Sequence, residues 1–277
     1  MPPRRATSWT SRRSSAAGNH HRDVSREPFV LERSGPGVTS AADGGAVYIM
    51  PDPEPEGARV WFFTRLGGVS REPYVSLNVS KKVGDDPATV EENLSIIRRA
   101  MGGRPSAWVR QVAGDRVVEV SEAGLAGEAD ALLTSERDLC LVVAVADCIP
   151  VALVGERRVA MVHSGWRGTL AGISGKAVRS MGEQGVRAYV GPGIRGCCYE
   201  VSEELAEEFA ARYGAGVVSG RHLSLPEAIR TDLERSGVEE IHDLGLCSGC
   251  RPDLFYSHRK QGPLTGRNLA AIAKVSP

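Results

Sequence analysis

The chain has 277 residues, of which 42% are apolar and 25% charged, and its 34 Lys and Arg residues balance its 34 Asp and Glu residues. This composition is that of an ordinary soluble globular protein, and the balanced charge does not indicate nucleic acid or an anionic membrane as a partner. No segment approaches the roughly 20 consecutive apolar residues of a membrane span. Because six Cys in so long a chain do not indicate a disulfide scaffold, we expect a reducing, cytoplasmic setting.

The first 45 residues are rich in Ser, Gly, Arg and Pro and show no hydrophobic periodicity. Residues 1–27 contain six Arg against Asp23 and Glu27, so their net charge is +4 (six minus two). They lack the apolar core of a secretory signal, and their composition is typical of disordered chain. We therefore predict a disordered or loosely attached basic tail, residues 1–45, followed by a single domain, residues 46–277.

Strands and helices are expected to be interspersed along this domain. Asp86 before Pro87 indicates a helix start with a carboxylate N-cap, and apolar residues then recur at helical spacing up to Met101. We expect strands at 46–50, 59–64, 107–112, 116–120, 187–190 and 241–245, and helices at 87–101, 170–183, from Ser202 and from Ser224 to Gly237. Several strands follow one another directly, which favours an α/β (α+β) domain with mixed β-sheets flanked by helices.

The stretch from Leu139 to Gly168 is the most informative part of the chain. Its two Val-rich apolar runs are typical of strands buried on both faces, and the polar residues 155–158 between them indicate a turn. In the resulting hairpin, Cys148 and His163 can meet beside the Gly-rich loop 164–168. A thiol beside an imidazole is either half of a metal site or a nucleophile with its base, whereas an inert buried Cys is the alternative.

The string Gly191–Gly196 matches the dinucleotide-binding fingerprint by its letters alone. In that motif a helix begins directly at the glycines and holds the pyrophosphate. Here residues 197–199 intervene and the expected helix begins only at Ser202. We therefore interpret the string as a structural or substrate-lining loop.

Cys247 and Cys250 form an isolated CxxC motif. A structural zinc site needs four ligands, and the adjacent Cys197 and Cys198 are the possible source of two more. Neighbouring side chains point in different directions in most backbone conformations, so ordinary reduced thiols are favoured over a metal site. His258 lies in a polar, aromatic run and is a candidate for lining a cleft.

Motifs that agree in order and spacing with one known family cover about residues 46–275: ADC at 146–148, VHSGWRGT at 162–169, TRLGGVS at 64–70, LNVSKKVGDDPATVEEN at 77–93, GPGIRGCCYEV at 191–201 and FYSHRKQGPLTGR at 255–267. Together they resemble the laccase-domain family, once called multicopper polyphenol oxidases. Its members are described as zinc-dependent purine nucleoside phosphorylases with adenosine deaminase activity, or as peptidoglycan editing factors. The resemblance implies a single catalytic α/β domain.

The resemblance also implies a zinc site built from the His of a QVHG motif, the Cys of ADC and the His of VHxGWRG. In this chain the second and third ligands are Cys148 and His163. The first is absent, because Ala113 stands where the family has its His. A catalytic zinc normally keeps three protein ligands, so zinc, the implied cofactor, is expected to bind weakly or not at all. Copper is not expected, since only four His lie outside the tail.

Three interpretations of this departure remain open from the sequence. His258 or Asp115 replaces the missing ligand, the Cys148–His163 pair acts without metal as nucleophile and base, or the chain has lost the ancestral activity.

Two activities follow from the resemblance, both on small molecules rather than nucleic acid or membrane. In the first, phosphate attacks the anomeric carbon of a purine nucleoside, or a metal-bound hydroxide deaminates adenosine. Arg65 and Arg167 are then candidates to hold phosphate. The alternative role is a surface salt bridge for Arg65 and stacking on Trp166 for Arg167. Asn78 and Gln111 are candidates to bind the ribose or base.

In the second activity, an amidase acting on peptidoglycan precursors, Cys148 attacks the carbonyl carbon and His163 takes the thiol proton. The amides of the loop 165–168 then hold the oxyanion. A degenerate, non-catalytic member is the third possibility.

Overall fold

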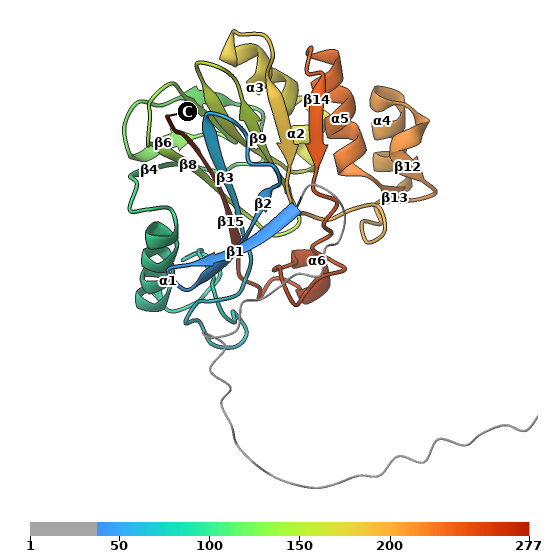
Figure 1. The fold of residues 1–277 in the computed structure, drawn as a ribbon. Coiled ribbons are helices and arrows are strands. Elements are labelled where there is room, and N and C mark those ends of the chain that lie inside the picture. The colour runs from blue at the N-terminus through green and yellow to red at the C-terminus, as the bar shows by residue number, and fades with distance from the viewer. Residues whose placement is uncertain (1–37, 277) are drawn as a thin grey trace, which may run out of the picture.

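Two β-sheets lie face to face at the centre of the molecule (Figure 1). This computed structural model describes residues 38–276. One sheet has seven strands in the order β1 (Val38–Asp43), β2 (Ala46–Pro51), β3 (Ala58–Phe63), β15 (Asn268–Lys274), β8 (Cys140–Val145), β4 (Ser106–Arg110) and β6 (Gly124–Glu128). The other has six strands in the order β14 (Glu240–Asp243), β11 (Arg187–Val190), β9 (Ile149–Val154), β10 (Val159–Ser164), β7 (Ala131–Thr134) and β5 (Val117–Glu119).

Helices cover the two outer faces of this pair of sheets. They are α1 (Pro87–Ala100) on one face and α2 (Trp166–Leu170), α3 (Ile173–Met181), α4 (Glu203–Tyr213) and α5 (Leu225–Arg235) on the other, with a 3₁₀ turn at Ala215–Val217 and a small ribbon of β12 (Val218–Ser219) and β13 (His222–Leu223). The single turn α6 (His258–Gln261) buries no residue. Figure 1 shows α1 on one side of the molecule and α3, α4 and α5 grouped on the other. Within the described residues, no helix is both long and apolar enough to cross a membrane.

The layers follow from the alternation of side chains along the central strands. In β9, Val151 and Leu153 pack with the helices α3, α4 and α5, whereas Ala152 and Val154 pack against the seven-stranded sheet. Strand β15 alternates in the same way between the core that the sheets share and the core beneath α1. Both faces of these strands are buried, which explains their continuously apolar sequences. The expected mixed α/β fold is confirmed.

The helix ends follow the local signals in the sequence. The carboxylate of Asp86 accepts a hydrogen bond from the backbone N–H of Thr89, and Ser224 caps α5 in the same way. The helix expected at 170–183 is two helices instead. Gly172 has a φ of 76° and separates α2 from α3, because a left-handed residue cannot continue an α-helix.

The first strand lies inside the segment that we expected to be a disordered tail. Strand β1 pairs antiparallel with β2 across Gly44 and Gly45, whose φ angles are 59° and 97°. A Gly-Gly pair with both φ angles positive favours a tight hairpin turn, and this signal outweighs the weak apolar pattern of residues 38–43. The prediction was therefore wrong for residues 38–45, and residues 1–37 lie outside the described residues.

The central hairpin forms as expected, but its first apolar run changes sheet. Strand β8 belongs to the seven-stranded sheet and β9 to the six-stranded sheet. Asp147 lies in the turn between them, with a φ of 86°. Because β9 and β10 pair Pro150 with His163, the turn that carries Cys148 lies at the same end of the hairpin as His163.

A glycine allows a second loop to cross this turn. A Cβ atom on Gly193, which follows β11, would lie 2.9 Å from the carbonyl oxygen of Asp147 and 3.0 Å from that of Cys148. Both atoms belong to the backbone and have little freedom to move. The loop can therefore approach the turn this closely only with glycine at this position.

We expect Gly193→Ala to lower the free energy of unfolding by about 1–3 kcal/mol, the usual cost of overpacking. Gly216→Ala is the matched control, because a Cβ there meets no atom within 4 Å, and it should leave stability unchanged or raise it by up to about 1 kcal/mol. Urea denaturation of both variants measures the difference. Equal stability of the two would contradict the close approach.

Candidate functional site

Cys148 and His163 lie together, as the sequence predicts. Cys148 is in the turn before β9, and His163 is a buried residue near the end of β10. The imidazole forms a hydrogen bond with the Cys148 thiol. Gly165 leaves room for this contact, since a Cβ there would lie only 3.0 Å from the Cys148 Sγ.

Asp130 completes the arrangement, and sequence reasoning missed it. Its Oδ1 lies 2.8 Å from His163 Nδ1, and its carboxylate accepts hydrogen bonds from the backbone N–H groups of Val112, Ala113 and Gly114 at 3.2, 3.0 and 2.7 Å. Its own carbonyl oxygen accepts the N–H of His163 at 2.7 Å. The sequence signal was a single acidic residue directly before the apolar strand β7. A carboxylate that is buried there needs hydrogen-bond donors around it.

The charges of this pair stabilise each other. Burial by itself lowers the pKa of His163. Cys148 and the hydrogen bond with Asp130 raise this pKa by a larger amount, to about 10. Burial raises the pKa of Asp130, but the hydrogen bonds from His163 and from the N–H groups of Gly114 and Val112 hold it below its usual value. Asp130, His163 and Cys148 thus form a chain of a carboxylate, an imidazole and a thiol, in which the carboxylate orients the imidazole toward the sulfur.

Cys148 and His163 line a cavity of about 970 Å³. The wall also includes His258, Asp147, the two indole rings of Trp108 and Trp166, and five basic residues: Lys81, Lys82, Arg110, Arg259 and Arg267. Of the five, Lys81 and Arg110 are paired with Glu91 and Glu128. Clustered positive charge attracts anions, and indole rings stack on flat aromatic groups. The cavity therefore suits a ligand that is both anionic and aromatic.

Arg65 and Arg167 do not line this cavity. Arg65 donates hydrogen bonds to the carbonyl oxygens of Val75 and Pro252 and lies 4.5 Å above the ring of Tyr256. Arg167 is exposed and stacks 4.2 Å above the ring of its neighbour Trp166. The structure thus gives Arg65 a role in joining two loops and Arg167 the stacking role.

Asn78 and Gln111 both hold backbone segments. The buried Asn78 side chain bonds with Ser80 and Asp85 and accepts the N–H of Arg267. Gln111 lines the cavity, but its amide exchanges two hydrogen bonds of 2.9 Å with the backbone of Ala144. These contacts use the groups that we expected to bind a substrate.

Ala113, where the resemblance implies the first His ligand, lies at the edge of the Cys148–His163 site. Its N–H and His163 Nδ1 share the same oxygen of Asp130. Of the two proposed replacements, His258 lines the cavity, whereas Asp115 pairs with Lys176 outside it. Among residues 38–276, no third His, Cys, Asp or Glu joins Cys148 and His163 in a close ligand group.

The residues present therefore fit a catalytic zinc only in part. A metal-bound His typically has its other ring nitrogen held by a carboxylate, as Asp130 holds Nδ1 of His163 here. Two protein ligands nevertheless fall short of the three that a catalytic zinc keeps.

The structure contradicts our expectation that the side chains of Cys197 and Cys198 point in different directions. The sulfur atoms of Cys197, Cys198, Cys247 and Cys250 all lie within 4.8 Å of one another. The two adjacent residues do not diverge, since the sulfurs of Cys197 and Cys198 each lie 3.4 Å from that of Cys250. These residues form a second group of thiols, apart from Cys148.

We expect Asp130→Asn to lower the free energy of unfolding by about 3 kcal/mol, because it breaks a buried charged pair. The pKa of His163 lies above its unfolded value of 6.5, so the stability from its protonation is complete below about pH 6.5 and is lost as the pH rises toward 10. The variant should lower the pKa of His163 and reduce the loss of stability as the pH rises. NMR titration of the ring and denaturation at several pH values, in chelator-treated protein, measure both.

Glu240→Gln is the matched control for Asp130→Asn. It breaks a similar contact, in which Glu240 Oε1 lies 2.6 Å from His242 Nε2. The side chains of Glu240 and His242 are 54% and 46% exposed. An exposed pair contributes little, so this variant should change stability by less than about 0.5 kcal/mol. A comparable effect of the two substitutions would show that burial of Asp130 does not stabilise the site.

The chain is similar to known proteins along most of its length. Residues 59–274 match the family described as multi-copper polyphenol oxidoreductase laccase. The chain is 39% identical over 224 residues to a purine nucleoside phosphorylase of Deinococcus radiodurans, covering 76% of this chain and 87% of that protein. It is 36% identical over 239 residues to a purine nucleoside phosphorylase of Pseudomonas aeruginosa, covering 81% and 97%.

Among solved structures, YlmD from Geobacillus stearothermophilus superposes with a TM-score of 0.78 at 28% identity, covering 87% of this chain and 99% of that one. The family match includes the Cys148–His163 site, the cavity and all strands of both sheets except β1 and β2. The chain therefore belongs to the laccase-like family that includes these purine nucleoside phosphorylases.

Proposed function

We propose that this protein catalyses the phosphorolysis of purine nucleosides in a reducing, cytoplasmic setting. The observation that carries the proposal is the Asp130–His163–Cys148 chain at the wall of a cationic cavity that also holds two indole rings. The names of the related enzymes support the same substrate class. Neither Arg65 nor Arg167 has a part in this proposal, because other cations line the cavity.

Arg267 is the residue best suited to bind phosphate. Burial lowers the pKa of Arg267, while Cys148 and Asp147 act in the opposite direction, so its guanidinium lies within electrostatic reach of the thiol. One of its nitrogens donates to the carbonyl oxygens of Thr265 and Gly266, which fixes the group in place. A held guanidinium binds phosphate with paired hydrogen bonds.

The base lies between the indole rings in this proposal, with its departing nitrogen toward Cys148 and His163. A phosphate oxygen attacks the anomeric carbon, and the bond from that carbon to the base nitrogen breaks. The bonding electrons leave with the base, which takes a proton supplied by the Cys148–His163 pair. Asp130 stabilises the imidazolium from which this proton comes.

Adenosine deamination is not part of the proposal. That reaction uses a hydroxide activated by bound metal, and the described residues supply two of the three ligands that such a zinc needs. Zinc, where it binds at Cys148 and His163, would supply a Lewis acid beside the cavity.

One observation favours a different function. The order carboxylate, imidazole, thiol is also that of a cysteine hydrolase, in which the imidazole deprotonates the sulfur that attacks a carbonyl carbon. An amidase acting on peptidoglycan precursors is therefore the second candidate. The cationic wall favours phosphorolysis over it, because an amide substrate does not require so many cations.

We expect Cys148→Ala to reduce phosphate-dependent release of free base from inosine and adenosine at least about 100-fold, the size of a general acid–base contribution. Cys140→Ala is the matched control, because Cys140 is a buried thiol in β8 outside the cavity. It should retain the activity. Base release is measured with and without phosphate, and full activity of Cys148→Ala would refute the proposed site.

An amidase assay on muramyl-peptide precursors distinguishes the second candidate. Phosphorolysis without amide cleavage would exclude the amidase. Amide cleavage that depends on Cys148, without phosphorolysis, would show that the protein is an amidase instead.

We expect Ala113→His to bind one more equivalent of zinc than the unaltered protein, because it restores a third ligand beside Cys148 and His163. The φ of Ala113 is 57°, a value that His tolerates better than most residues. Adding Cys148→Ser to Ala113→His should remove the extra zinc. Metal analysis after dialysis measures the difference, and equal zinc in Ala113→His and unaltered protein would contradict the assignment of position 113.

A further inference from the structure

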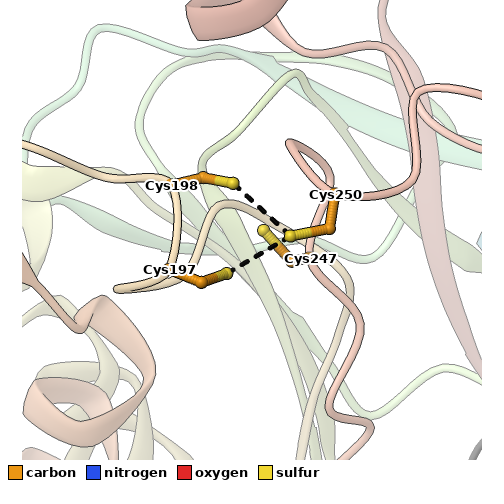
Figure 2. Close-up of side chains that lie close together, drawn as sticks. All are labelled: Cys197, Cys198, Cys247 and Cys250. Atoms are coloured by element: carbon orange, nitrogen blue, oxygen red, sulfur yellow. Dashed lines mark hydrogen bonds between the residues drawn. The ribbon is translucent and has the colours of Figure 1, made fainter. Parts of the chain in front are cut away.

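The four cysteines outside the catalytic cavity come from two loops that meet at one end of the six-stranded sheet. Cys197 and Cys198 follow β11, and Cys247 and Cys250 follow β14, its parallel neighbour. Figure 2 shows the four sulfur atoms turned toward one another, with Cys250 between Cys197 and Cys198. All four lie within 4.8 Å of one another.

A tight turn explains how two adjacent cysteines reach the same point. The backbone N–H groups of Cys198 and Tyr199 both donate to the carbonyl oxygen of Arg195, at 2.8 and 2.9 Å. The backbone at Cys197 and Cys198 is therefore curled rather than extended, and the usual opposition of neighbouring side chains in a strand does not apply. Both thiols can then face Cys250.

The two loops are also fixed to each other by their backbones. Gly193 donates to the carbonyl oxygen of Leu246 at 3.2 Å, and Ser248 donates to that of Gly193 at 3.0 Å. Gly249, inside the CxxC motif, leaves space for the cluster, since a Cβ there would lie 2.9 Å from Cys198 Cβ and 3.0 Å from its sulfur. The loops thus hold the sulfurs together through contacts that need no metal.

We propose that Cys197, Cys198, Cys247 and Cys250 bind one zinc ion tetrahedrally, as a structural site separate from Cys148 and His163. Four thiolates are the ligand set of closed structural zinc sites, with zinc–sulfur distances of about 2.3 Å. Such a tetrahedron separates its sulfurs by about 3.8 Å, close to the spacing seen here. Binding replaces the four thiol protons by the metal and releases them to solvent.

Neighbouring groups offset the negative charge of such a site. The backbone N–H groups of Arg195, Gly249 and Cys250 donate hydrogen bonds to the sulfur of Cys247, as outer partners commonly do for metal-bound ligands. The Lys260 side chain lies beside Gly249, with its Cε 3.4 Å from the position of a Cβ there. Zinc with four thiolates has a net charge of −2, and these donors and this ammonium group stabilise it.

The site would connect the catalytic turn to the rest of the fold. Ile194, before the first cysteine pair, donates its N–H to the carbonyl oxygen of Asp147 at 2.8 Å. Ser248, between the second pair, donates its hydroxyl to Asp147 Oδ1 at 2.7 Å. Because Asp147 adjoins Cys148, zinc in the cluster would position this turn without touching a substrate.

The metal is tested first in Cys148→Ser protein, which retains the whole cluster and removes the other thiol site. We expect one equivalent of zinc after purification in reducing buffer, and X-ray absorption at the zinc edge should show four sulfur neighbours at about 2.3 Å. Fewer than about 0.2 equivalents after incubation with zinc, or a shell of nitrogen and oxygen neighbours, would overturn the proposal. This result does not depend on whether the protein is a phosphorylase.

Single substitutions in the cluster provide the second measurement. Cys197→Ser and Cys250→Ser should each reduce bound zinc at least tenfold in competition with a chelator and lower the Tm by about 5–10 °C. Cys140→Ser, which alters a thiol of the core, is the control and should keep the zinc of unaltered protein. If the cluster variants retain this zinc, or if thiol counting finds a disulfide among the four cysteines in reducing buffer, the proposal fails.

Discussion

The candidate site depends on the burial of one carboxylate. Asp130 has no exposed surface, and a carboxylate in such a place requires several hydrogen bonds or a partner charge. Three successive backbone amides and the His163 ring meet this requirement together. The same contacts fix the segment 112–114, the strand β10 and the orientation of the imidazole. The electrostatics of the site and its geometry therefore have a common cause.

Cys148 is held by a different set of constraints. It lies in a turn where the chain passes from one sheet to the other, and the residue before it has a left-handed backbone conformation. Such a conformation costs roughly 1–2 kcal/mol in a residue other than glycine. The side chain of Asp147 offsets this cost through bonds with Ser248 and with the N–H of Arg259. The thiol thus depends on contacts with residues 101 and 112 positions further along the chain than Asp147.

The sequence predicts much of this fold because its signals are local. The N-cap at Asp86, the cap at Ser224 and the apolar central strands are each read within a few residues, and the hairpin that joins Cys148 to His163 follows from them. What the sequence does not show is long-range pairing. Backbone groups that become buried when the sheets pack need hydrogen-bond partners, and polar side chains supply them. Gln111 bonds with Ala144, Asn78 with Arg267, and Asp130 with three backbone amides. Polar residues that looked available to a substrate are therefore used by the fold.

The two groups of thiols differ in what surrounds them, and this difference indicates different chemistry. The sulfur of Cys148 lines a large cationic cavity and has one imidazole as its partner, so a ligand can reach it. The sulfurs of the four-cysteine cluster face one another, and backbone N–H groups bond to Cys247, so the four can occupy every position of one tetrahedral metal ion. A site with an open position is suited to catalysis, and a closed one to holding loops together. The two groups share no residue, so a change at Ala113 beside the first leaves the four sulfurs of the second in place.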